Sequence, residues 1–146
     1  MTERALSTGL SYVLLLGVTV ILISGLSVAA GDLLQTQHEQ TVESELNVVG
    51  ERIAADLMTV DRLVQTSAEA ETVSVVSNPP QTVSDGQYSV RIESENSNTK
   101  LVLESAETSV IVTTIAPTST DVEETRLSGG TMTISYQDGS LVVSNG

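Results

Sequence analysis

The sequence predicts an α+β fold in which one long N-terminal helix packs on a small antiparallel β-sheet. Two observations predict it. An uncharged apolar run is followed by apolar residues at helical spacing, with no proline before Pro79. From residue 71 onward, β-forming residues alternate between apolar and polar, which is the period-2 pattern of half-buried strands. We expect a transmembrane helix over 6–31, an amphipathic continuation over 32–70 and a β head over 71–146.

The apolar run predicts a membrane span. Between Arg4 and Asp32 no residue is charged. As a helix, these 27 residues reach about 40 Å, at about 1.5 Å per residue, against a hydrocarbon core of roughly 30 Å. Backbone groups in lipid must pair within the segment, so the run is expected to be helical despite its valines, isoleucines and threonines.

The flanking charges predict the orientation. Arg4 is the only basic residue before the run, which places the N-terminus in the cytoplasm and the C-terminal domain outside the cell. The alternative is a cleaved secretory signal, because Val28-Ala29-Ala30 is an acceptable cleavage site before Gly31. The run is longer than the roughly 7–15 apolar residues of such a signal, which favours a single-pass anchor.

Small residues recur along the apolar run. Gly17, Ser24 and Gly31 are spaced by seven, and Gly25 and Ala29 form a small-xxx-small pair. Such faces let helices approach closely in a membrane or in a filament. Glycine and serine are also common in membrane helices generally, so both interpretations stay open.

An apolar stripe follows the run and predicts the helix–sheet core. Its members recur at spacings of three and four, as on one face of a helix: Val42, Leu46, Val49, Ile53, Leu57, Val60 and Val64. Gly50 is expected to weaken this helix by about 1 kcal/mol relative to alanine. The stripe is the one long apolar surface that could cover a sheet.

The C-terminal half predicts a meander of about four or five antiparallel strands. Polar residues 95–98 read as a turn, and residues 117–126 read as a polar loop with room for a helical turn. Asp138-Gly139 is a strong hairpin signal, because glycine accepts the positive φ of a tight turn. These strands are expected among six β-forming segments: 72–76, 88–93, 99–104, 109–115, 131–137 and 140–144.

The charge and cysteine content exclude several functions. Nineteen Asp and Glu against six Lys and Arg give a net charge of −13. This repels phosphate backbones, so no nucleic-acid partner is expected. The acidity serves solubility, and together with the scarcity of lysine and of large aromatics it favours a high-salt habitat. The absence of cysteine excludes disulfides and thiolate chemistry.

No pattern of catalysis is present. His38 is the only histidine, and there is no G-x-S-x-G motif, P-loop, dinucleotide fingerprint or EF-hand loop. Glu93, Glu95 and Glu104 could face one another across a hairpin, but a solvated strand face explains them. We therefore expect no catalytic residues, cofactor, metal or small-molecule substrate, and predict that the chain is not an enzyme.

The N-terminus resembles that of archaeal type IV pilins. Arg4-Ala5 followed by Leu6-Ser7 matches the basic-small/apolar-Ser pattern at which a prepilin peptidase cuts. The resemblance implies a leader of residues 1–5, a cut between Ala5 and Leu6, and a hydrophobic helix that is kept. It also implies a helix packed on an antiparallel sheet. Its partners would be membrane lipid, the prepilin peptidase and other pilin-like subunits.

Two departures refine the resemblance. Many haloarchaeal pilins have proline where this chain has Thr8, and the glutamate of bacterial pilins is replaced by Leu10. These departures favour a minor pilin or a pilin-like accessory subunit. The expected function is a structural subunit of a type IV surface filament or a related secretion apparatus. The alternative is a signal-anchored extracellular binding domain that does not polymerise.

Because the run from Ala5 to Gly31 carries no charge, the full-length chain should stay with the membrane pellet after high-salt and carbonate washes. Immunoblotting of the fractions checks this. Recovery of the intact chain in the soluble fraction would contradict the membrane assignment.

Overall fold

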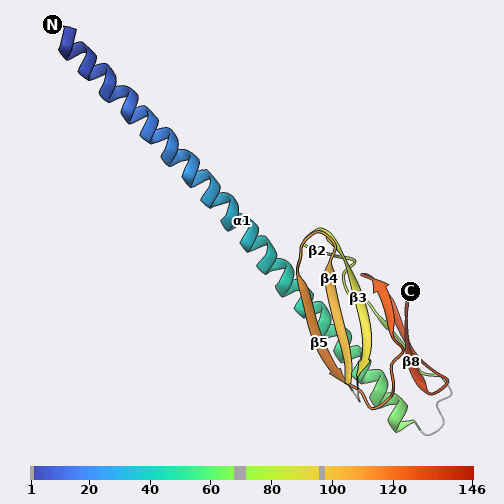
Figure 1. Cartoon of the computed structure of the whole chain (residues 1–146). Coiled ribbons are helices and arrows are strands. Elements are labelled where there is room, and N and C mark those ends of the chain that lie inside the picture. The colour runs from blue at the N-terminus through green and yellow to red at the C-terminus, as the bar shows by residue number, and fades with distance from the viewer. Residues whose placement is uncertain (1, 68–71, 96–97) are drawn as a thin grey trace. The chain divides into compact units, whose positions relative to one another are not determined.

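A single helix occupies the N-terminal part of the chain. The computed structural model describes residues 2–67, 72–95 and 98–146, and helix α1 spans Thr2–Thr66, 65 residues (Figure 1). No proline interrupts it, and Ser67 N–H donates to the Leu63 carbonyl at 3.0 Å at its C-terminal end. The helix thus starts earlier than the expected residue 6 and ends at Thr66; residues 68–70 of the expected amphipathic segment lie outside the described residues.

Two compact units divide the chain within α1. The first comprises Met1–His38, and the second comprises Glu39–Gly146 and contains every strand that the structure describes. The second unit is called the head here. The fold is α+β, as predicted, with one long N-terminal helix packed through its second part on antiparallel sheets.

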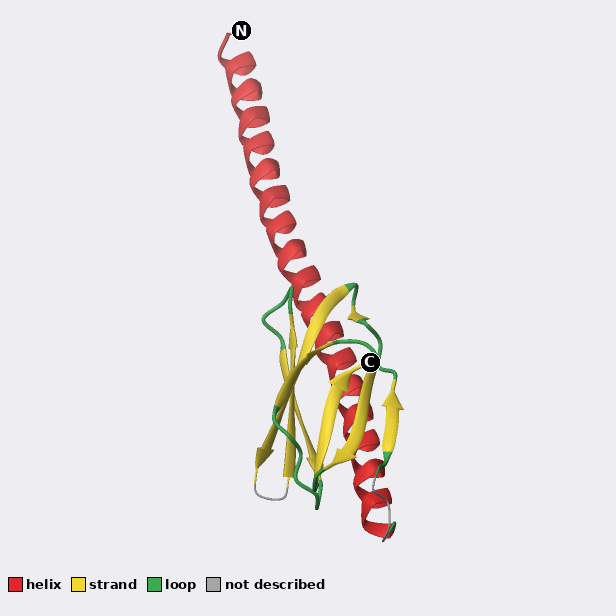
Figure 2. Ribbon diagram, turned by 90° about the vertical axis from the view of Figure 1, so that its right-hand side faces the viewer, coloured by secondary structure: helices red, strands yellow, loops and turns green. Residues whose placement is uncertain are grey.

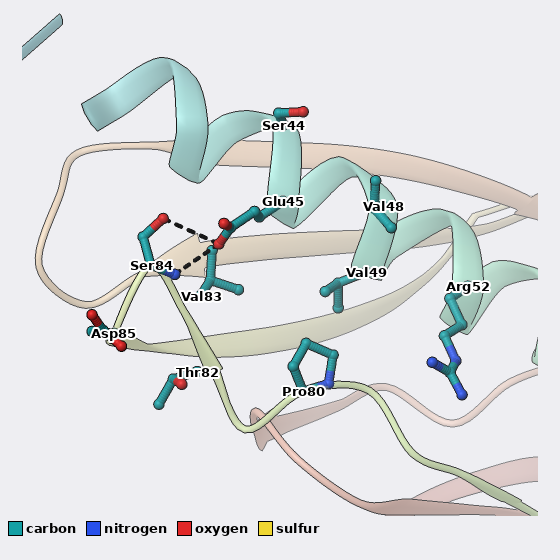
Figure 3. A pocket seen from close by; sticks show the side chains of 10 residues that line it. All are labelled: Ser44, Glu45, Val48, Val49, Arg52, Pro80, Thr82, Val83, Ser84 and Asp85. Atoms are coloured by element: carbon teal, nitrogen blue, oxygen red, sulfur yellow. Dashed lines mark hydrogen bonds between the residues drawn. The ribbon is translucent and has the colours of Figure 1, made fainter. Parts of the chain in front are cut away.

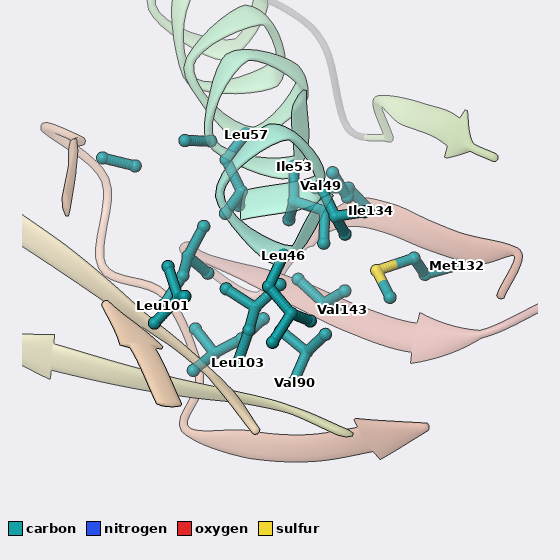
Figure 4. Close-up of a cluster of buried hydrophobic side chains, with 14 of the residues drawn as sticks. Leu46, Val49, Ile53, Leu57, Val90, Leu101, Leu103, Met132, Ile134 and Val143 are labelled. Atoms are coloured by element: carbon teal, nitrogen blue, oxygen red, sulfur yellow. The ribbon is translucent and has the colours of Figure 1, made fainter. Parts of the chain in front are cut away.

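The apolar stripe of α1 lies in the core of the head. Six of its seven members are at most 3% exposed, and Val64 is half-buried against the cluster. They meet inward-facing residues of both sheets, among them Val90, Leu101 and Leu103 of one sheet and Ile134 and Val143 of the other (Figure 4). Each fully buried aliphatic side chain contributes roughly 1.5–3 kcal/mol of transfer free energy, so this stripe is the main hydrophobic contact of the head.

The strands form two sheets, so the expected single meander is wrong. In one sheet, β7 (Met132–Gln137) lies between β1 (Ser74–Ser77) and β8 (Ser140–Asn145). The other has the order β2-β3-β4-β5, with β6 also pairing with β3: Thr82–Val83, Gly86–Glu95, Asn98–Ser105, Ile111–Pro117 and Thr125–Ser128. All these strand pairs are antiparallel. Figure 2 shows the strands of both sheets along the second part of α1.

The pairing of β1 explains why the three-stranded sheet was not predicted. It follows α1 in sequence but pairs with β7, with Ser74 opposite Ser135 and Ser77 opposite Met132. A pairing between segments nearly 60 residues apart leaves no local signal in the sequence, since period-2 alternation reveals a strand but not its partner.

Two hairpin turns use positive φ angles. Asp138 and Gly139, between β7 and β8, have φ values of 49° and 95°, as the Asp-Gly pair predicts. Ser84 and Asp85, between β2 and β3, have φ values of 46° and 66°. The second turn was missed in the sequence, because its two central residues are not glycine.

The predicted polar loop over 117–126 contains structure of another kind. Instead of a helical turn, it holds a parallel bridge between Val122 and Leu141 and the start of β6. Glu123 N–H donates to the Leu141 carbonyl at 2.9 Å, and Leu141 N–H donates to the Asp121 carbonyl at 2.8 Å. This segment therefore joins the two sheets. The turn predicted over 95–98 includes residues 96 and 97, which lie outside the described residues.

Gly50 marks a close approach of α1 to the five-stranded sheet. A Cβ at this position would lie 2.5 Å from Thr114 Oγ1 and 3.1 Å from Leu103 Cδ1. The residue that lowers the helix propensity is thus required by packing, because β5 reaches the helix backbone there.

Gly50→Ala should therefore lower the melting temperature of the full-length chain in detergent. Alanine gains about 1 kcal/mol of helix propensity, but overpacking typically costs about 1–3 kcal/mol, so the net change is expected to be a modest loss. Thr114→Ala removes the Oγ1 atom in question. In that background Gly50→Ala should be neutral or stabilising. A higher melting temperature for Gly50→Ala in the native background would contradict the close approach.

Candidate functional site

The first unit presents a long exposed helix surface that is mostly apolar and carries no charge between Arg4 and Asp32. From Leu10 to Leu34 its large aliphatic side chains are between 52% and 72% exposed. An exposed apolar surface of this size is not tolerated by a soluble monomer and indicates contact with lipid or with other proteins. This stretch is long and apolar enough to cross a membrane, and none of its most apolar window is buried within the chain.

Several hydroxyl groups of this surface are bonded within the helix. Thr19, Ser24 and Ser27 donate to the carbonyls of Leu15, Val20 and Ile23 at 2.8–2.9 Å. A polar group in hydrocarbon costs several kcal/mol unless it is paired, so these bonds remove a large obstacle to insertion. The helix can therefore enter lipid without any partner for these three side chains.

The residues of the predicted leader site lie in the first turns of α1. The Arg4 carbonyl accepts hydrogen bonds from Ser7 Oγ at 3.0 Å and Thr8 Oγ1 at 2.8 Å. Arg4 itself is exposed, and the side chains of Ala5 and Leu6 lie outside the described part of the chain. A peptidase that cuts between Ala5 and Leu6 would have to open this helical turn first.

The small residues predicted to support helix packing are open to their surroundings. A Cβ added to Gly17, Gly25 or Gly31 would meet nothing within 4 Å. Ser24 is exposed and bonded to its own helix. Within the described residues, no other element packs against these positions, so another helix could approach them closely.

The head contains a groove that the sequence did not predict. It has a volume of about 540 Å³ and lies between α1 and the segment from Pro80 to Asp85 (Figure 3). Val48, Val49 and Val83 supply apolar surface, and Arg52 lies at the opposite end of the groove from Glu45. No sequence motif marks these residues, because the groove depends on how the β2–β3 hairpin meets the helix.

Glu45 fixes one wall of this groove. Its Oε2 atom accepts hydrogen bonds from Ser84 N–H at 2.7 Å and from Ser84 Oγ at 3.1 Å (Figure 3). These bonds satisfy the backbone of the strained β2–β3 turn, where Ser84 has a positive φ. Glu45 is therefore occupied in holding the hairpin against α1.

Asp61 is the buried carboxylate of the head. It is 6% exposed. Its two oxygens accept hydrogen bonds from Thr120 N–H at 2.9 Å, Ser119 N–H at 3.1 Å and Gln65 Nε2 at 2.8 Å. Burial alone would raise the pKa of Asp61, but the hydrogen bonds from Thr120, Ser119 and Gln65 outweigh it and lower the pKa. The arrangement ties the last turns of α1 to the segment after β5.

The three glutamates considered in the sequence do not form a carboxylate cluster. Glu93 lies opposite Lys100 in the β3–β4 register, whereas Glu104 lies opposite Ser89. Glu93 pairs with Lys100 and with Arg91, both at 3.5 Å. Glu104 pairs with Arg126 at 3.2 Å and Arg91 at 3.8 Å, and Glu95 is exposed at the end of β3. The outer face of β3, β4 and β6 therefore carries a row of ion pairs.

The fold and the exposed segment define a class of protein: an α+β protein whose N-terminal helix contains a candidate membrane span. The chain belongs to a family of unknown function (DUF7266), whose model matches residues 1–144. Neither the search of curated proteins nor that of solved structures found a match.

Asp61→Asn should destabilise the head at neutral pH by about 1–3 kcal/mol, because the amide cannot accept all three hydrogen bonds. The folded pKa of Asp61 is depressed, so its contribution is complete above the unfolded pKa and is lost as pH falls through the folded pKa. The stability difference between native chain and variant should therefore shrink in acid.

Denaturant unfolding of the full-length chain at several pH values measures this difference. Glu43→Gln, which removes one carboxylate charge at an exposed position, is the matched control and should change stability little. A difference between the native chain and Asp61→Asn that stays constant down to pH 3 would show that ionised Asp61 does not anchor the loop.

Proposed function

We propose that this chain is a pilin-like structural subunit, anchored in the cell membrane by a single span before it assembles into a surface filament or a related secretion apparatus. The observation that carries the proposal is the change of environment along one uninterrupted helix. The large apolar side chains of α1 from Leu10 to Leu34 are exposed, whereas from Val42 onward one face is buried in the head.

An exposed apolar helix surface can be covered in two ways. Lipid covers it while the subunit is in the membrane, and neighbouring helices cover it in a filament. The open positions at Gly17, Gly25 and Gly31 support the second, because small residues allow close helix–helix contact. The bonded hydroxyls support the first, because they need no partner from another chain.

The leader supports the same function. Arg4 is the one side-chain cation before the apolar segment, and its removal with residues 1–5 would free the helix to leave the membrane. Drawing an arginine to the bilayer centre costs about 2.5–3.5 kcal/mol or more, so processing lowers the barrier to extraction. The proposed location is an N-terminus in the cytoplasm and a head on the outer surface.

The groove beside Arg52 favours a second candidate. A signal-anchored extracellular domain that does not polymerise could use this 540 Å³ groove, which Val48, Val49 and Val83 make partly apolar, to hold a small ligand. The two candidates differ in what happens to the N-terminus, since a simple anchor keeps residues 1–5.

The mature N-terminus should therefore be Leu6 in protein taken from its native membrane, as measured by intact-mass and peptide mass spectrometry. Arg4→Gln should block the cut if the peptidase reads the basic residue. Glu3→Gln, which alters the neighbouring charge, is the matched control and should be processed normally. An intact start at Met1 or Thr2 would favour the simple anchor, and a start at Gly31 would show a cleaved secretory signal.

A further inference from the structure

Strand β5 is a free edge that lacks the usual protection against pairing. Among the described strands, β5 pairs only with β4, and its seven residues Ile111–Pro117 include no charge. Edge strands normally carry lysine, bulges or prolines within them, and an exposed apolar edge tends to pair with another strand. Here proline appears only as the last residue.

The other sheet offers no comparable edge. β1 has four residues, and β8 is partly covered, because Leu141 forms hydrogen bonds with the segment from Asp121 to Glu123. Among the described strands at sheet edges, β5 is therefore the longest, and it carries no charge.

Two isoleucines make this edge apolar on its outer face. Ile111 is 59% exposed and Ile115 is 63% exposed, and they flank exposed Thr113 on the same face of the strand. They face away from α1, since Val112 and Ala116 point into the core. Large apolar side chains exposed on a sheet edge indicate a contact surface.

The strand is complementary to itself when it pairs in antiparallel fashion about Thr113. In that register, Ile111 of one copy lies opposite Ile115 of the other, and Thr113 lies opposite Thr113. Cross-strand pairs of β-branched residues are among those that stabilise antiparallel sheets. The two apolar pairs are equivalent, as an isologous contact requires.

The neighbouring charges favour the same register. Within one head, Lys100 lies opposite Ile115 and Glu104 lies opposite Ile111. Across the contact, each row would then read Lys100, Ile115, Ile111 and Glu104, with opposite charges at its two ends. Arg91 lies opposite Val102, which lies opposite Thr113, so the two Arg91 residues would be about 24 Å apart, beyond the screening length at physiological salt.

We propose that the β5 edge is a docking surface for the β5 edge of a second copy, giving a continuous sheet across two heads. The inference goes beyond the proposed function and does not depend on it, because it uses residues of the head alone. Because the two β5 strands are antiparallel, the parts of α1 in the two heads also run in opposite directions. Residue Glu39, where each head begins, then lies at opposite ends of the pair. The pairing is thus a head-to-head contact, different from side-by-side packing of parallel helices.

The absence of cysteine allows a direct test. In the full-length chain in detergent, Thr113→Cys should form a disulfide-linked dimer on mild oxidation. The residue lies on the two-fold axis, where paired Cα atoms are about 4.5–5.5 Å apart, within disulfide range. Thr59→Cys, the same substitution at an exposed position of α1, is the matched control and should give no dimer.

A mixture of Ile111→Cys and Ile115→Cys chains should cross-link, whereas either variant alone should not, because the register places residue 111 opposite residue 115. Independently of any thiol, Ile115→Lys should convert the dimer of the native chain to monomer in light scattering. Equal cross-linking of Thr113→Cys and Thr59→Cys, or a native chain with the same monomeric mass as Ile115→Lys, would overturn the proposal. A mature protein that still carries residues 1–5 would count against the proposed filament subunit and would leave the proposed β5 contact unaffected.

Discussion

The head depends on the packing of one apolar helix stripe against two separate sheets. Neither the three-stranded nor the five-stranded sheet could bury its inner face without the residues from Val42 to Val60, which contact both. A small sheet alone exposes one apolar face to water and is marginally stable. The tight approach at Gly50 shows how closely this contact is fitted, since even one methyl group there would meet β5.

The same helix changes its surroundings partway along its length. Its first part has no buried side chain among those described up to Leu34, whereas its second part supplies seven residues to the core and two more, Met58 and Val64, packed against it. Local helix propensity cannot produce this division, because valine, isoleucine and threonine are abundant in both parts. The division lies in the pattern of charged residues, which are missing between Arg4 and Asp32 and reappear beyond it at positions off the stripe.

The helix and its stripe could be predicted because their pattern is local and strongly periodic. The turn at Asp138-Gly139 could be predicted because its signal is the residue pair itself. The pairing of β1 with β7 could not, since register between distant segments leaves no periodic trace. The groove beside Arg52 was missed for the same reason: Glu45 and Ser84, 39 residues apart, meet only in the folded head. The leader at Arg4 and Ala5 rests on a short motif, which the fold of the head does not test.

The bonding of Asp61 has a mechanical consequence. The carboxylate accepts hydrogen bonds from the backbone N–H groups of Ser119 and Thr120. This segment continues directly to the bridge between Val122 and Leu141. Tension applied along the last turns of α1 would therefore be passed at once to the end of β5 in one sheet and to β8 in the other. The hydrogen bonds of Asp61 would therefore oppose a pull on the head through its helix, and both sheets would share the load.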